Sequence, residues 1–284
     1  MRLIDGKAIA KKLNAATKVD AARLTEAGTT PKLAIAVPTD DESTAWYVRS
    51  IKRAAERLGL LCDIETLTGS TGPQICAALD RLSADPTVHG IICQTPLPEG
   101  VTLLDVAGHI VPEKDIDGTN PQSIGRLAAG LPTFAPATAQ AVLDILKAEK
   151  IPLSGANVVV VGRSMVVGKP AALLLTAEDA TVTVCHSRSR DLPGLCRQAD
   201  ILVAAVGRPQ LLTADYVRKD AVIIDVGTNP TPEGGLVGDV DPDSVAPIAG
   251  ALTPVPGGVG PVTTALLLRH VIEAVDRTQE GATA

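Results

Sequence analysis

Apolar positions recur at helical spacing in four stretches of the first half of the chain: 5–27, 43–58, 72–84 and 138–149. Short apolar runs typical of strands lie between these stretches, at Leu33–Val37, Cys62–Leu67 and Gly90–Cys93. Because helices and strands alternate, this half of the chain is predicted to be an α/β domain.

The alternation becomes regular after Pro152 and Gly155. Strands are predicted to begin near Asn157, Thr181, Ile201 and Ala221, with room for one helix between each pair. This spacing predicts a doubly wound parallel sheet. A last amphipathic stretch, Val262–Arg277, follows the loop TPVPGGVGP and need not belong to that sheet's domain.

Residues 157–190 have the pattern of a nucleotide-phosphate site. Val158–Val161 suits a strand that is buried on both faces of a parallel sheet, and Gly162 allows a tight turn after it. Backbone N–H groups at the start of the next helix can then face a pyrophosphate. The spacing from Gly162 to Gly168 departs from G-x-G-x-x-G, so the prediction depends on the strand–turn–helix–strand context, against the alternative of an ordinary βαβ unit.

The end of the second strand of this motif favours NADP over NAD. An NAD site usually places Asp or Glu there, on the ribose 2′-hydroxyl, whereas this chain has His186, Ser187 and Arg188. These residues do not repel a 2′-phosphate, and Arg163 directly after the first glycine could bind the same group.

Composition indicates a two-domain cytoplasmic enzyme. The chain has 284 residues, of which 45% are hydrophobic, enough for two cores. A net charge of −6 argues against nucleic acid as a partner, and no apolar run approaches a membrane span. The first residues, MRLIDGKAIAKKL, do not have a signal peptide's apolar core. Five cysteines without C-x-x-C spacing are expected to be reduced, and four scattered histidines predict no metal site.

Four short motifs carry candidate chemistry. Aromatic residues are scarce, so the adjacent pair Trp46 and Tyr47 suggests a stacking platform for a planar ligand, although Trp46 could equally be a core anchor. Gln94, in CQTPLPEG, can direct its amide into a cleft from a rigid turn. EKDIDG at 113–118 places carboxylates near a glycine, and PVPGGVGP at 254–261 can approach a flat ligand closely.

In this order, the motifs resemble the bifunctional methylenetetrahydrofolate dehydrogenase/methenyltetrahydrofolate cyclohydrolase family over nearly the whole chain. The resemblance is carried by IDGKAIA, the T-x-x-YV helix, QTPLP, KDIDG followed by GRL, VVVVGRSMVVGKP, TVTVCHSRSRDL, ADILVAAVG, VIIDVG, GLVGDVD and TPVPGGVGP. It implies a tetrahydrofolate-binding catalytic domain at 1–139 and 262–284, and a Rossmann-type NADP domain at 140–261. The C-terminal helix would return to the first domain, the folate would lie in a cleft between the domains, and the protein would be a homodimer.

The resemblance also implies roles for individual residues. Tyr47 would stack on or orient the rings, Gln94 would lie beside the reacting carbon, and Asp117 would accept two parallel hydrogen bonds from the pterin. The remaining substrate-binding positions would be Thr44, Pro256, Gly257 and Gly258. The cofactor would be held by Gly162, Arg163, Ser164, Val167, Gly168, His186, Ser187, Arg188 and Thr228.

One departure from the family pattern bears on the reaction. The family has Tyr-x-x-x-Lys on its helix, with the lysine assisting addition of water to the methenyl carbon, and here that lysine position is Ile51. Downstream residues keep the family register. Lys52 lies about 100° round the helix from this position, and Arg49 lies about 200° from Tyr47, so neither is an obvious substitute. Smaller departures are Thr44, where the family usually has Ser, and PATA at 136–139 for PCTP.

The sequence therefore predicts NADP-dependent oxidation of 5,10-methylenetetrahydrofolate with feeble or absent cyclohydrolase activity. Hydride transfer needs mainly positioning, whereas hydrolysis needs proton transfer that isoleucine cannot supply. Three alternatives stay open: a fully bifunctional enzyme that uses another group such as Lys52, a catalytically impaired folate-binding homologue, and a shikimate- or malate-type dehydrogenase, which QTPLP and PVPGGVGP fit poorly.

Overall fold

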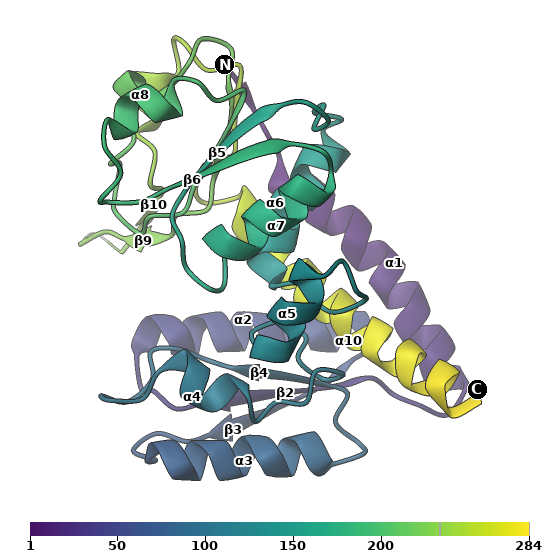
Figure 1. Ribbon diagram of the computed structural model, residues 1–284. Helices are drawn as coiled ribbons and strands as arrows, with labels where there is room; N and C mark the ends of the chain where they lie inside the picture. Colours follow the sequence, from purple (N-terminus) through teal and green to yellow (C-terminus); the bar gives the residue numbers. More distant parts are fainter. Residues whose placement is uncertain (233, 284) are drawn as a thin grey trace. The chain divides into compact units, whose positions relative to one another are not determined.

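The computed structural model describes residues 1–232 and 234–283, which form two compact units (Figure 1). Unit 1 comprises Met1–Lys11 and Thr138–Thr263, and unit 2 comprises Lys12–Ala137 and the residues from Thr264 onward. The domain boundaries expected from the sequence remain a prediction, because the compact units of a chain need not coincide with its functional domains.

Unit 1 is built on a six-stranded, wholly parallel sheet in the order β1-β11-β8-β7-β5-β6. Its strands are β1 (Arg2–Leu3), β5 (Asn157–Val161), β6 (Thr181–Cys185), β7 (Ile201–Ala204), β8 (Val222–Asp225) and β11 (Ala251–Leu252). Val158 through Val161 are buried, as expected for a central strand. The predicted doubly wound sheet is confirmed, and its four predicted strands begin within one residue of the expected positions.

Shorter elements complete unit 1. Its helices are α6 (Ala137–Ala148), α7 (Gly168–Ala177), α8 (Leu192–Cys196), α9 (Pro242–Val245) and a 3₁₀ turn at Ala214–Tyr216. A two-stranded antiparallel ribbon pairs β9 (Asn229–Pro230) with β10 (Leu236–Val237).

Unit 2 contains a three-stranded parallel sheet in the order β3-β2-β4. Its strands are β2 (Lys32–Val37), β3 (Leu61–Thr66) and β4 (Gly90–Cys93). The helices that lie wholly or for the most part in unit 2 are α1 (Gly6–Glu26), α2 (Glu42–Leu58), α3 (Gly72–Ala84), α4 (Leu103–Ala107), α5 (Pro121–Ala128) and α10 (Val259–Thr283). The predicted helices and strands of this half are present.

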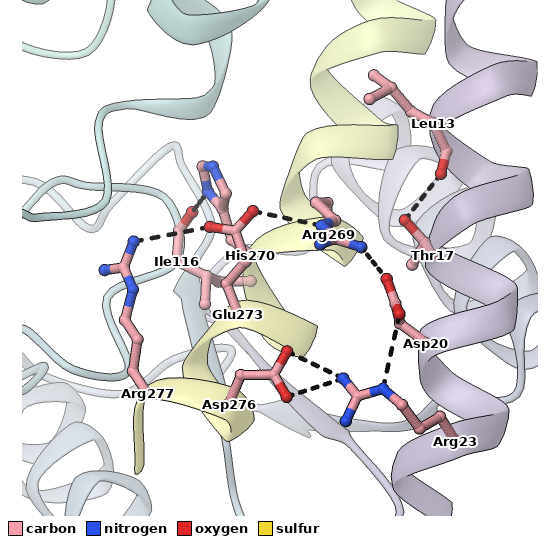
Figure 2. Close-up of polar contacts among 10 residues, drawn as sticks. All are labelled: Leu13, Thr17, Asp20, Arg23, Ile116, Arg269, His270, Glu273, Asp276 and Arg277. Atoms are coloured by element: carbon pink, nitrogen blue, oxygen red, sulfur yellow. Dashed lines mark hydrogen bonds and ion pairs between the residues drawn. The ribbon is translucent and has the colours of Figure 1, made fainter. Parts of the chain in front are cut away.

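The C-terminal helix α10 is attached to unit 2 by charged side chains (Figure 2). Arg269 pairs with Asp20 of α1, and Arg23 Nη2 lies 2.9 Å from Asp276 Oδ1. His270 adds a bond of 2.7 Å between its Nδ1 and the carbonyl oxygen of Ile116. These contacts fix α10 against α1 and against the turn that precedes Asp117. The predicted return of this helix to the first domain is confirmed from Thr264 onward.

The helices formed by the described residues are all too short or too polar to cross a lipid bilayer.

Candidate active site

Tyr47 is presented by α2, whose start and end are set by its sequence. Asp41 caps the helix by accepting a hydrogen bond of 2.7 Å from the Thr44 N–H, and Gly59 ends it with a left-handed φ of 87°. The buried face of α2 carries Thr44, Val48, Ile51, Ala55 and Leu58. Tyr47 lies at the border of this face and is half-buried.

The phenol of Tyr47 has two polar neighbours within unit 2. Its side chain is hydrogen-bonded to Thr264 of α10, and the Asp117 carboxylate is close enough to act on it electrostatically. Burial, with the charge of Asp117 as a smaller contribution, raises the pKa of Tyr47 to about 12. Tyr47 is therefore a neutral hydrogen-bonding group at neutral pH.

Asp117 lies in the turn that follows Asp115 and precedes Gly118. Gly118 has φ 62°, and a Cβ there would lie 2.5 Å from the carbonyl carbon of Ala135, so only glycine fits. The Asp117 carboxylate accepts a hydrogen bond from the backbone N–H of Ala137, at the start of α6. Burial and the neighbouring Asp115 raise the pKa of Asp117 to about 7.

The turn that carries Asp117 is organised by Asp115, which is fully buried. The Asp115 carboxylate accepts hydrogen bonds from the Thr119 N–H at 3.0 Å, the Asn120 N–H at 2.8 Å and the Ser123 hydroxyl at 2.7 Å. Sequence reasoning gave Asp115 no role of its own. The sequence feature that could have indicated a role for Asp115 is its position in KDIDG, two residues before Asp117.

Gln94 directly follows β4 and is 8% exposed. Its N–H donates to the carbonyl of Ala36 on the neighbouring strand at 2.9 Å. The next residue, Thr95, has its carbonyl oxygen 3.0 Å from the Thr44 hydroxyl, which also lies 2.9 Å from Asp41 Oδ2. Thr44 therefore connects the start of α2 to the segment that carries Gln94.

Ile51, at the position of the family lysine, is wholly buried. Burial raises the pKa of the Cys62 thiol in β3 to about 11, and the charge of Lys52 acts in the opposite direction. Lys114 donates to the carbonyl oxygens of Ser83 at 2.8 Å and Asp85 at 2.6 Å, at the C-terminal end of α3. The groups that act on the pKa of the Tyr47 phenol, besides burial, are thus a carboxylate and a hydroxyl.

Trp46 does not lie in the core. Its side chain is 63% exposed, which rules out the alternative that it is a core anchor. It lines a shallow surface hollow with Arg49, Ser50, Arg53 and other residues of the outer face of α2. Trp46 and Tyr47 consequently face different directions, so the structure does not bring them together as one platform.

In unit 1, the turn between β5 and α7 depends on two glycines. Gly162 has φ 132°, and a Cβ there would lie 2.1 Å from the carbonyl oxygen of Ala205. A Cβ on Gly168 would lie 2.1 Å from the carbonyl oxygen of Gly162. Ser164 turns its hydroxyl toward the N–H groups of Val167 and Gly168, at 3.2 and 3.4 Å. The turn therefore has the close backbone packing that a phosphate loop requires.

The residues after β6 form a compact basic turn. His186 Nδ1 accepts a hydrogen bond of 3.1 Å from the Arg188 N–H, which leaves Nε2 as the protonated nitrogen of the neutral ring. Ser187 and Arg188 are exposed, as are Arg163 and Ser164 of the preceding turn. In the part of the chain that the structure describes, neither Arg163 nor Arg188 forms a salt bridge with an acid.

Two buried carboxylates support the neighbouring loops and were missed by sequence reasoning. Asp239 accepts hydrogen bonds from the N–H groups of Val206, Gly207 and Arg208, at 2.6 to 3.0 Å. Asp225, at the end of β8, accepts from the N–H groups of residues 227, 239 and 240, at 2.9 to 3.0 Å. Burial is the main cause that raises the pKa of Asp225 to about 6. Both residues shape the carboxyl edge of the parallel sheet, where such folds bind nucleotides.

The segment containing Pro256, Gly257 and Gly258 also belongs to unit 1. Gly257 has φ 111°, and the Gly258 N–H donates to the carbonyl of Pro254 at 2.7 Å. The loop packs on the start of α1, where a Cβ on Gly6 would lie 1.8 Å from the carbonyl oxygen of Gly258. Thr228, on the segment after β8, is exposed.

Comparison with known proteins gives a consistent result. The model of the tetrahydrofolate dehydrogenase/cyclohydrolase catalytic domain matches residues 4–117, and the model of that family's NAD(P)-binding domain matches residues 136–279. A relative named bifunctional protein FolD, from Parafrankia sp., is 59% identical over 96% of this chain and 99% of its own length.

Two solved structures are closely similar. The bifunctional FolD dehydrogenase/cyclohydrolase from Campylobacter jejuni has a TM-score of 0.95 at 36% identity, covering 98% of this chain and 99% of that one. The FolD from Trypanosoma brucei, complexed with NADP and an inhibitor, has a TM-score of 0.92 at 35% identity, covering 97% of each chain. Because the two family models together match most of the chain, a shikimate- or malate-type dehydrogenase is excluded, and the chain belongs to the tetrahydrofolate dehydrogenase/cyclohydrolase family.

Proposed function

We propose that this protein oxidises 5,10-methylenetetrahydrofolate to 5,10-methenyltetrahydrofolate with NADP, and that it hydrolyses the methenyl product feebly or not at all. The first part is supported by family membership and by similar solved structures that carry the dehydrogenase name. The second part is carried by one observation, the buried isoleucine at position 51.

Three side chains of unit 2 would handle the folate. The Asp117 carboxylate offers two acceptor oxygens to the parallel donors of a pterin, and its turn is held by Asp115. The ring of Tyr47 would stack on the substrate while its neutral phenol stays hydrogen-bonded. Gln94 would direct its amide toward the reacting carbon from the end of β4. In this proposal Thr44 acts by holding the Thr95 carbonyl.

The residues at the carboxyl edge of the unit 1 sheet fit NADP. Gly162 and Gly168 leave a backbone cradle that a Cβ would fill, and Arg163 and Arg188 are exposed cations without acidic partners among the described residues. Val167 and Ser164 complete the turn, with His186, Ser187 and Thr228 beside it as further proposed contacts. When bound, the nicotinamide ring supplies the hydride acceptor. Pro256, Gly257 and Gly258 are proposed to line the substrate side.

The two reactions make different demands on the protein. Removal of hydride from the methylene carbon is assisted by the lone pair of the adjacent nitrogen, so the chain mainly has to position the reactants and exclude water. Addition of water requires a group that accepts a proton and a group that returns one to the departing nitrogen. Loss of such a group typically slows a reaction by roughly 10²–10⁴-fold. The Ile51 side chain cannot accept or donate a proton, and Lys52 lies about 100° round the helix from it.

The test is to follow purified protein supplied with methylenetetrahydrofolate and NADP. NADPH and the methenyl product are measured separately by their absorbance. We expect the methenyl product to accumulate in step with NADPH and then to decay no faster than in buffer alone. Rapid, protein-dependent decay would overturn the second half of the proposal, while absence of NADPH would overturn the first.

A pair of variants identifies the responsible position. Ile51→Lys is expected to raise the rate of methenyl hydrolysis by roughly 10²-fold or more and to keep NADPH formation, which also reports that the variant is folded. Lys52→Met is the matched control and should change neither rate. If Lys52→Met instead abolished hydrolysis in an otherwise bifunctional protein, Lys52 would be the base.

We further propose that the protein is a cytoplasmic homodimer without a nucleic-acid partner. The family resemblance supports the dimer, and the net charge of −6 disfavours polyanionic partners. Light scattering at several protein concentrations tests the dimer.

A further inference from the structure

The peptide group that joins Ile116 to Asp117 is held by a histidine of α10. His270 is buried, and its Nδ1 lies 2.7 Å from the carbonyl oxygen of Ile116. Because a carbonyl oxygen only accepts hydrogen bonds, Nδ1 carries the proton and donates it. Figure 2 shows the imidazole reaching this carbonyl from the helix. The helix therefore contacts the backbone directly beside Asp117.

This hydrogen bond acts on the orientation of Asp117. A peptide unit is planar, so the direction of the Ile116 carbonyl also sets the direction of the Asp117 N–H and the place of its Cα. The peptide unit on the other side is fixed as well, because the Gly118 N–H donates to the carbonyl of Asp115 at 3.0 Å. Both peptide units that flank Asp117 are held, and with them the direction in which its side chain leaves the backbone.

Close packing keeps the histidine in place. Its ring lies against that of Phe134, which is wholly buried, with the ring centroids 5.1 Å apart. On the next residue of α10, a methyl group of Val271 approaches Gly90 of β4, as does a methyl group of Ile116. A Cβ on Gly90 would lie 2.9 Å from each of these methyl groups. Helix, strand and turn are thus in direct contact, so the imidazole cannot leave the carbonyl without disturbing its neighbours.

We propose that His270 is a positioning residue for Asp117, which fixes the preceding peptide group and so holds the carboxylate where it can accept the two parallel hydrogen bonds of the pterin. The inference rests on the proposed function, in which Asp117 binds the folate. Two hydrogen bonds accepted side by side tolerate little rotation of the carboxylate. A peptide group left free before Asp117 should therefore weaken folate binding, although His270 itself does not need to touch the substrate.

Three variants separate this role from the general attachment of α10. His270→Leu removes the donor and keeps a side chain of similar size. His270→Asn keeps a donor, because the asparagine Nδ2 is attached to Cγ as the histidine Nδ1 is. Arg269→Met is the matched control on the same helix (Figure 2). It removes ion pairs with Asp20 and Glu273 and leaves the bond to Ile116 in place.

The experiment measures kcat and KM for methylenetetrahydrofolate and for NADP, with urea unfolding as the check on folding. His270→Leu should lower kcat/KM for the folate by roughly 5–30-fold, as expected when a buried acceptor loses its donor, and leave KM for NADP unchanged. His270→Asn and Arg269→Met should each stay within about 2-fold of the unsubstituted protein.

A double-mutant cycle tests whether His270 acts through Asp117. In the Asp117→Ala protein, which has no carboxylate to position, His270→Leu should lower kcat/KM by less than a further 2-fold or about that. An equal loss in both backgrounds would show that His270 acts on another part of the site.

The single variants also have outcomes that would overturn the inference. These are a loss in His270→Leu below about 2-fold, or an equal loss in His270→Asn or Arg269→Met. If His270→Leu does not fold, His270→Phe takes its place, because it keeps a ring beside Phe134 and lacks the donor.

Failure of the proposed function is seen separately, as absence of NADPH formation by the unsubstituted protein. In that case the same variants are compared by the dissociation constant of tetrahydrofolate, measured by calorimetry, and the same ratios are expected. Absence of tetrahydrofolate binding to the unsubstituted protein would overturn the inference as well.

Discussion

The Asp117 carboxylate lies beside the Tyr47 phenol, and its charge adds to burial in keeping that phenol neutral. Asp117 is itself held close to its titration point, with a pKa of about 7. The two groups meet because the turn after Asp115 brings Asp117 toward α2, while α10 is attached to both. A charged acceptor and a neutral aromatic ring are thereby placed together, which suits a ligand that is flat and rich in N–H donors.

Substitution of Asp117 is expected to raise stability and lower activity. In Asp117→Asn the charge disfavoured by burial and by Asp115 is absent, so the free energy of unfolding near pH 8 should rise by about 1–3 kcal/mol. The same change removes a charged acceptor from the pterin, so kcat/KM should fall by roughly 10–100-fold. Urea unfolding and steady-state kinetics measure the two effects.

The pH dependence of that stability difference has a defined sign. The folded-state pKa of Asp117, about 7, is above its ordinary value of 3.8, so the folded protein binds more protons between these values. The stability of the unsubstituted protein relative to Asp117→Asn must therefore fall as pH rises through this window. Asp40→Asn, at an exposed carboxyl, is the control and should show no such trend. A difference that stayed constant with pH would contradict the raised pKa.

Local pattern in the sequence predicted the elements on which the proposed site residues lie. Tyr47, Gln94 and Asp117 each stand next to a strand end, a helix start or a glycine turn, so spacing along the chain placed them on the right elements. Thr264 and Asp239 could not be found in this way, because their partners lie far away in the sequence and only packing brings them together. The orientation of Trp46 was undecided for a related reason: an aromatic residue at the border of a helix face can point either way.

The hydroxyl of Thr44 is expected to stabilise the segment that carries Gln94. Thr44→Val leaves the Thr95 carbonyl and the Asp41 carboxylate each without one contact, so the free energy of unfolding should fall by about 1–2 kcal/mol and kcat should fall with it. Thr44→Ser retains both contacts and should remain close to the unsubstituted protein. A loss in Thr44→Ser without one in Thr44→Val would show that the methyl group matters instead of the hydroxyl.

Preference for NADP should depend on Arg188. Because this exposed guanidinium has no acidic partner among the described residues, Arg188→Ala should cost little stability and raise KM for NADP by roughly 10–100-fold, with little effect on KM for NAD. Arg197→Ala is the control, since Arg197 Nη1 already donates to the carbonyl of Asp215. An equal rise in KM for both cofactors would place Arg188 away from the 2′-phosphate.

Of the substitutions considered, replacement of Asp239 is expected to cause the largest loss of stability, because Asp239 is fully buried in unit 1. Its Oδ2 accepts from the N–H groups of Val206 and Gly207, and its Oδ1 accepts from the Arg208 N–H and the Asn229 amide. Asp239→Asn keeps one carbonyl oxygen and turns an NH₂ group toward the remaining donors.

Two donors of the Asp239 carboxylate, at least one of them only part-buried, thus lose their acceptor in Asp239→Asn, which should lower the free energy of unfolding by about 1–3 kcal/mol. Because these donors hold the loop after β7, at the sheet edge proposed for the cofactor, KM for NADP should also rise in whatever protein remains folded. Asp215→Asn, at an exposed carboxyl of the same unit, is the control. A loss below about 0.5 kcal/mol in urea unfolding would mean that the loop finds other acceptors, and that Asp239 does not hold the carboxyl edge of the sheet.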